Sequence, residues 1–136
     1  MSLPSQIKCN FIAQNWAETP FHEMEGAGKL SRASITNTLS GDFVGEGVLE
    51  YLLSYPNTAG DVTFIGYERF VGAVGELKGT FTVEHHGLFS PTMGVSGALT
   101  IIAGSGTGDF SGITGNGQIT AIAGEHGGIY TLNLMQ

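Results

Sequence analysis

The chain has 136 residues, of which 41% are hydrophobic and only 12% charged, and its net charge is −7. This length and hydrophobic content predict one folded domain over residues 1–136 and exclude intrinsic disorder. The acidic excess repels phosphate backbones and anionic lipids, and no apolar run approaches the roughly 18 residues that span a bilayer, so we expect neither a nucleic-acid nor a membrane partner.

The glycine and cysteine contents indicate the shape of the fold and the cellular compartment. The chain contains 22 glycines, roughly twice the usual share of about 7%, and glycine in strands is typical of a strongly curved sheet. Cys9 is the single cysteine, and the start of the sequence lacks the basic and apolar regions of a secretory signal. We therefore expect a soluble protein of the reducing cytoplasm.

Apolar residues alternate with polar ones along most of the chain, a period typical of β-strands. Ile7, Cys9, Phe11 and Ala13 share one face of the first strand, for example. Proline and glycines make residues 19–28 a predicted loop, and glycines make residues 104–117 a predicted loop that caps one end. The predicted strands span residues 7–16, 29–39, 45–55, 62–74, 78–89, 94–103, 118–123 and 129–134.

Eight strands joined mostly by short turns favour an up-and-down barrel or a sandwich. We prefer the barrel, because a closed sheet exposes no edge in a chain with few protective lysines. The predicted fold class is therefore all-β, a single antiparallel eight-stranded barrel. The fragments 41–43 and 108–110, both Gly-Asp-Phe, indicate similar turns and not a repeat architecture.

Several ordered motifs resemble a known bacterial family. The resemblance is carried by the segments 30–36, 40–47, 64–69, 79–87 and 104–108, with Glu50-Tyr51, Gly112 and Gly115. Together they resemble the domain-of-unknown-function 3224 family, from about Phe11 to Leu132. The resemblance implies an eight-stranded barrel like that of allene oxide cyclase, and it implies no established reaction. Glu84 departs from the family pattern, where glutamine is more usual before the histidine.

Glu68 is the first candidate for chemistry. It shares a strand face with Val62, Phe64 and Phe70, so its carboxyl group faces the predicted core, where burial favours general acid or base behaviour. The structural alternative is a buried glutamate paired with Arg32 or a tyrosine hydroxyl group. Because Arg69 is adjacent on the strand, it points to the opposite side of the sheet.

His85 is the second candidate, on the apolar face with Phe81 and Val83, whereas His86 points outward. If residues 62–74 and 78–89 form a hairpin, Glu68 and His85 lie within a register step or two of each other. A core histidine bonded to a backbone carbonyl group is the alternative.

Other features give weaker signals. A barrel ligand would contact Glu68, His85 and five further candidates, namely Phe64, Phe81, Tyr67, Glu50 and Arg32. In residues 45–55 both faces are mixed, so either Glu50 or Tyr51 and Tyr55 could point inward.

The sequence shows no pattern typical of a metal or cofactor site. The adjacent histidines His85 and His86 point to opposite faces, and no phosphate-loop lysine follows the glycines of residues 104–108, so we expect no metal and no cofactor. Cys9 is expected to be packed and inert.

Three functions remain open at this point. The barrel binds a small apolar or amphipathic ligand oriented by Glu68 and His85, or it is a lyase or isomerase that uses one of them for proton transfer. With a filled interior, it is a structural or interaction protein instead. The sequence is compatible with a monomer and with a homo-oligomer such as a dimer.

Overall fold

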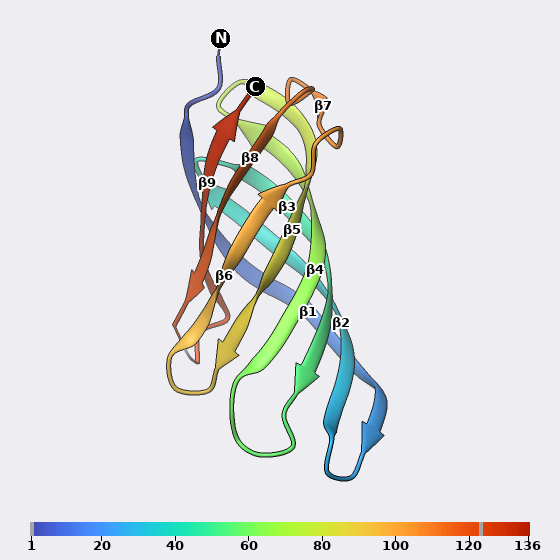
Figure 1. Ribbon diagram of the computed structural model, residues 1–136. Helices are drawn as coiled ribbons and strands as arrows, with labels where there is room; N and C mark the ends of the chain where they lie inside the picture. Colours follow the sequence, from blue (N-terminus) through green and yellow to red (C-terminus); the bar gives the residue numbers. More distant parts are fainter. Residues whose placement is uncertain (1, 123) are drawn as a thin grey trace.

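The computed structural model describes residues 2–122 and 124–136, and β-strands dominate them (Figure 1). The strands are β1 (Gln6–Met24), β2 (Gly28–Gly41), β3 (Val44–Tyr55), β4 (Val62–Val74), β5 (Leu77–Ser90), β6 (Gly94–Ile101), β7 (Thr107–Gly108), β8 (Thr114–Ala121) and β9 (Gly127–Met135). In these two ranges no helix is long and apolar enough to cross a membrane.

Eight of the strands form a closed antiparallel ring. Its order is β1–β2–β3–β4–β5–β6–β8–β9, and β9 pairs back to β1. The β4–β5 hairpin completes the closure with pairs from Val62–Phe89 to Val74–Leu77. Burial alternates along β4, so every second residue from Val62 to Phe70 points into the ring as the period-two pattern predicts. The predicted all-β antiparallel barrel is confirmed.

The first strand is longer than predicted. β1 continues to Met24 and pairs with β2 through most of the segment that was expected to be a loop. Pro20 is tolerated because β9 accompanies β1 only as far as Ile12, so that beyond this point β1 has a partner on one side only. A register shift between Pro20 and His22 absorbs the remaining irregularity. The prediction of a loop over residues 19–24 was wrong.

A row of glycines crosses the sheet near the end that carries the chain termini. Gly45 pairs with Gly72, Gly72 with Gly79, and Gly79 with Gly108, on four successive strands. A Cβ atom at each of them would collide with a backbone carbonyl oxygen of a neighbouring strand. The strands approach too closely there for any side chain, which confirms the strong curvature expected from the glycine content.

The glycine-rich connection after β6 caps this same end (Figure 1). Phe110 and Ile113 from the connection are buried in the core, and β7 pairs with β5 above them. The connection itself is shorter than predicted. β6 ends at Ile101, and β8 already begins at Thr114, because Thr114–Ala121 finds partners on both β6 and β9. Ala123, the predicted end of that strand, lies outside the described residues, as does Met1.

Candidate functional site

A cavity of about 340 Å³ lies in the half of the barrel away from the termini. Its mouth is formed by Trp16, Phe89 and the turn residues Glu125 and His126, all of them exposed. Its walls are apolar and come from both sides of the ring, with Phe11, Ile35, Leu49, Leu53, Phe64 and Ile119 among them. The cavity is therefore an apolar chamber with an open outer end.

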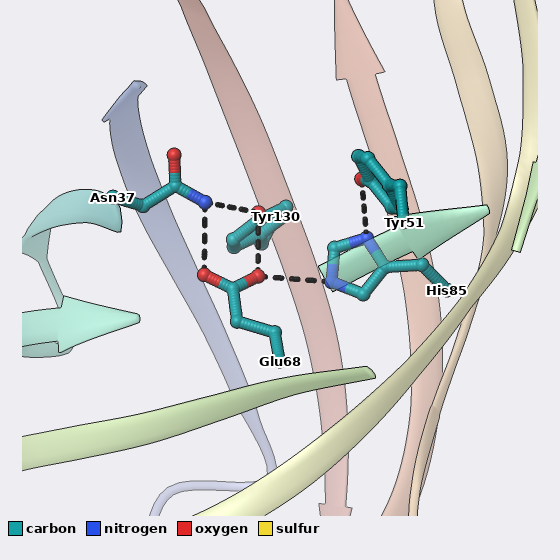
Figure 2. A network of polar contacts seen from close by, with 5 residues as sticks. All are labelled: Asn37, Tyr51, Glu68, His85 and Tyr130. Carbon is teal, nitrogen blue, oxygen red and sulfur yellow. Dashed lines mark hydrogen bonds and ion pairs between the residues drawn. The ribbon is translucent and has the colours of Figure 1, made fainter. Parts of the chain in front are cut away.

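Polar side chains lie at the inner end of this cavity. Asn37, Tyr51 and Tyr130 line it, and Glu68 and His85 lie behind them, fully buried. Figure 2 shows the five side chains converging from strands that are far apart in the sequence. Buried polar groups are costly unless they are hydrogen-bonded, and this cluster bonds largely to itself.

Glu68 is the centre of the cluster. Its Oε1 accepts hydrogen bonds from the Tyr130 hydroxyl group at 2.7 Å and faces His85 Nε2 at 2.9 Å, while its Oε2 accepts from Asn37 Nδ2 at 2.9 Å. The predicted pairing of Glu68 with His85 is confirmed. Gly66 lies opposite His85 in the β4–β5 register, so Glu68 is its diagonal neighbour on the inner face.

His85 connects Glu68 to the cavity wall. Its Nδ1 lies 2.8 Å from the Tyr51 hydroxyl oxygen, and Tyr51 lines the cavity. With Glu68 ionised, a neutral His85 ring carries its proton on Nε2, so Nδ1 accepts the Tyr51 O–H. A Tyr51–His85–Glu68 chain of hydrogen bonds therefore runs from the cavity into the core.

Gly47 makes room for the Glu68 carboxyl group. A Cβ atom at position 47 would collide with Glu68 Oε2 and crowd the rest of that carboxyl group. Gly47 pairs with Asn37 on one side and with Phe70 on the other, so it lies beside the cluster in the first part of β3. Here a glycine is required by the neighbouring side chain, since its φ is not in the left-handed region.

Asn37 and Tyr130 were not predicted as site residues. Asn37 interrupts the inward apolar series Ile35 and Leu39 on β2, and Tyr130 precedes the inward Leu132 on β9. A polar residue in an otherwise apolar strand face is the signal that could have identified Asn37. Its Nδ2 also contacts the Tyr130 hydroxyl oxygen at 3.1 Å.

Three predicted ligand contacts lie outside the barrel. Arg32, Glu50 and Tyr67 line a surface groove over β2, β3 and β4, on the opposite side of the sheet from Glu68. Arg32 Nη2 forms an ion pair with Glu50 Oε1 at 2.8 Å. Hydrogen bonds from Ser34, and then from Arg32, lower the pKa of Glu50.

The remaining candidates divide between the two halves of the barrel. Phe64 lines the cavity, whereas Phe81 packs among the phenylalanines of the opposite half. The alternative pairing of Glu68 with a tyrosine hydroxyl group is present, through Tyr130, and Arg32 is not its partner.

Burial and the charge of Glu68 act together on the two tyrosines. Both effects, burial foremost, raise the pKa of Tyr51 and of Tyr130 well above the usual value. Burial also raises the pKa of the Cys9 thiol to about 12, so the thiol is protonated at neutral pH. Within residues 2–122 and 124–136, no group of three or more His, Cys, Asp or Glu side chains could hold a metal ion.

Comparison with known proteins confirms the family that the sequence motifs resemble. The family model described as "Protein of unknown function (DUF3224)" matches residues 7–134. The crystal structure of a DUF3224 protein of unknown function from Shewanella oneidensis MR-1 is similar, with a TM-score of 0.75 and 20% identity over 96% of this chain and 98% of that chain. At this identity the likeness shows the fold alone. No curated protein matches the chain.

Proposed function

Since this chain belongs to the DUF3224 family of proteins of unknown function, we propose its function from its own geometry: it binds a small amphipathic molecule inside the barrel. The observation that carries the proposal is a cavity of about 340 Å³ with apolar walls and a polar inner end. Ligand pockets are typically concave, mostly apolar and about 300–1,000 Å³ in volume, with a few placed polar groups.

The lining supports a ligand with one apolar end and one polar end. The walls offer Phe11, Leu53 and Phe64 to the apolar part, whose burial contributes roughly 25 cal/mol per Å². Asn37 and Tyr51 lie where the polar part would sit. Glu68 and His85, behind these residues, orient the polar contacts and do not line the cavity themselves.

The direct test is whether the protein retains a small molecule. Native mass spectrometry of protein purified from the cells that naturally produce it is expected to show a bound species in the wild type. Ala121→Phe should remove that species, because Ala121 lines the cavity. Ala98→Phe is the matched control, since Ala98 is exposed on the neighbouring strand β6.

A second assay covers the case in which the ligand is lost during purification. The neutral fluorescent probe N-phenyl-1-naphthylamine should bind the wild type and Ala98→Phe, and it should bind Ala121→Phe at least tenfold more weakly. Equal binding to all three proteins, with no retained molecule, would contradict the proposal. That outcome favours the structural alternative.

The Tyr51–His85–Glu68 chain favours one further candidate function, a lyase or isomerase. Tyr51 alone of the three lines the cavity, so Tyr51 is the group that would exchange a proton with a bound substrate. In the base direction, the substrate C–H bond breaks and its proton moves to the Tyr51 oxygen, while the Tyr51 proton moves to His85 Nδ1. The electron pair of that bond stays on the substrate: in a lyase it forms a double bond and expels the leaving group, and in an isomerase it shifts the double bond so that another carbon takes a proton. The resulting imidazolium ion is stabilised by the Glu68 carboxylate.

Binding and catalysis are separated by comparing Tyr51→Phe and Glu68→Gln with the wild type on the retained molecule. For a lyase or isomerase, both variants bind the molecule but convert it at least 100-fold more slowly, as expected on loss of an acid–base group. For a binding protein, the molecule is recovered unchanged from the wild type and from both variants.

A further inference from the structure

The polar inner end of the cavity has a definite hydrogen-bonding preference, which is set by Asn37. Asn37 Nδ2 is directed to Glu68 Oε2 and to the Tyr130 hydroxyl oxygen, so the amide nitrogen is engaged. The amide oxygen Oδ1 is buried and has no hydrogen-bond partner among the described residues. Figure 2 shows this oxygen on the side of Asn37 that faces away from Glu68.

The orientation of this amide follows from its neighbours. Glu68 Oε2 is an acceptor, so the Asn37 side chain must turn its NH₂ group toward Glu68 and its oxygen away. A buried carbonyl oxygen without a partner destabilises the protein, because it has lost its hydrogen bonds to water and gained none in return. Oδ1 is covered in this structure, so the side chains around it must shift slightly before a ligand donor can reach it. A hydrogen bond formed there would remove this destabilisation.

The charge near the inner end disfavours an acidic ligand. Glu68 lies directly behind Asn37. The one basic side chain in the cluster, His85, lies between Tyr51 and Glu68 and already contacts Glu68. Burial and the Glu68 charge raise the pKa of Tyr51. The same two effects would oppose any other anion placed beside the Tyr51 hydroxyl group.

We propose that the cavity selects an uncharged amphipathic molecule whose polar end donates a hydrogen bond, through a hydroxyl or N–H group, to Asn37 Oδ1. A carboxylate is rejected at this position for two reasons. It has no hydrogen to donate to Asn37 Oδ1, and its negative charge is repelled by the nearby carboxylate of Glu68. This inference rests on the proposed binding function and goes beyond it by stating the chemical class of the ligand.

Three probes of similar size test the donor and the charge separately. They are 1-octanol, its isomer heptyl methyl ether, which has the oxygen but no donor, and octanoate at pH 8. Trp16 is the single tryptophan of the chain and lines the cavity, so its fluorescence reports occupancy for all three. Octanol should bind about tenfold more tightly than the ether, a difference of about 1.4 kcal/mol, and octanoate should bind more weakly than both.

The variant Asn37→Leu links the preference to one atom. It keeps a side chain of similar size and removes the acceptor, so octanol and the ether should bind it equally well. The comparison of the three probes on the wild type needs no variant, so a failure of Asn37→Leu to fold leaves the test intact.

Two results would overturn the selectivity and leave the binding function standing. One is an ether affinity equal to that of octanol in the wild type, and the other is octanoate binding as tightly as octanol. Failure of all three probes to bind would instead overturn the proposed binding function itself, and the selectivity with it.

Discussion

The two halves of the barrel are made from the same strands, yet one is filled and the other is hollow. In the half near the termini, four phenylalanine rings pack with centroid distances between 5.0 and 6.0 Å. These rings belong to Phe43, Phe70, Phe81 and Phe110, and all four are buried. In the other half, aromatic side chains line a cavity of about 340 Å³ without filling it.

The difference lies in the connections between the strands. Phe43 and Phe110 are the last residues of the two Gly-Asp-Phe turns, and each turn is held by its aspartate. Asp42 Oδ2 accepts a hydrogen bond from the backbone N–H of Lys8 at 2.8 Å, and Asp109 Oδ2 accepts one from Lys78 at 2.9 Å. The similar turns expected from the sequence are thus present, and they insert side chains into the core. The connections thus supply two of the four rings in this half, and β4 and β5 supply the other two, Phe70 and Phe81.

The largest expected effect is in the filled half. Phe81→Ala should lower the free energy of unfolding by about 3–5 kcal/mol, because it removes a ring that contacts Phe43, Phe70 and Phe110. Phe89→Ala at the cavity mouth, where the ring is 37% exposed, should cost about 1 kcal/mol. Urea unfolding of both variants measures the two values, and equal losses would show that the two halves do not differ in packing.

The polar cluster between the halves should be the next most sensitive. Glu68→Gln should lower the free energy of unfolding by about 1–3 kcal/mol, because its NH₂ group would face a donor of Asn37 or of Tyr130. Glu50→Gln is the matched control on the outer surface, where we expect less than about 1 kcal/mol. A smaller loss for Glu68→Gln than for Glu50→Gln would contradict the structural importance of the cluster.

Alkaline pH should destabilise the protein through its buried acids. Folding raises the pKa of Cys9 from 9.0 to about 12, so above pH 9 the unfolded chain releases a proton that the folded chain keeps. Each such proton lowers the free energy of unfolding by about 1.4 kcal/mol per pH unit. This stabilisation is complete below pH 9 and is lost as the pH rises toward 12.

The contribution of Cys9 can be isolated by substitution. Cys9→Ala should flatten the pH dependence between pH 9 and 10, where the usual pKa of tyrosine, 10.0, has not yet been passed. Above pH 10, Tyr51 and Tyr130 should add to the loss in both proteins. Identical slopes for wild type and variant between pH 9 and 10 would exclude Cys9 as the cause.

The smallest effect is expected on the outer surface. Arg32→Ala removes an ion pair with Glu50 in which both side chains are largely exposed, and such pairs contribute about 0–1 kcal/mol. Binding of N-phenyl-1-naphthylamine should not change, because Arg32 and the cavity lie on opposite sides of the sheet. A tenfold loss of probe binding would place the ligand site in the outer groove.

Local patterns predicted those parts of the site that a single hairpin determines. β4 and β5 keep one apolar face throughout, so Glu68 and His85 could be assigned to it, and their short connection set the register. In β3 both faces carry apolar residues, since Val48 and Leu52 are exposed while Leu49 and Leu53 are buried. The inward position of Tyr51 could not be chosen from such a strand.

The rest of the site depends on strands that do not pair with β4. Tyr130 comes from β9 and meets Glu68 across the barrel because the sheet closes. Asn37 comes from β2 and reaches Glu68 over Gly47 of the intervening strand β3. The strand around Pro20 also depends on distant pairing. A proline disfavours a central strand, but it is compatible with this part of β1, which has one neighbouring strand only. Long-range pairing of this kind leaves no local pattern in the sequence.

Gly47 couples the backbone of β3 to the Glu68 side chain, and this coupling can be tested by comparing the sequences of relatives. Because a side chain at position 47 would occupy the space of the Glu68 carboxyl group, these two positions are not free to vary independently. Family members with a larger residue at the position of Gly47 should carry a shorter residue at the position of Glu68. They should then also lack the donor preference at the position of Asn37, so this one pair of positions would divide the family into two ligand classes.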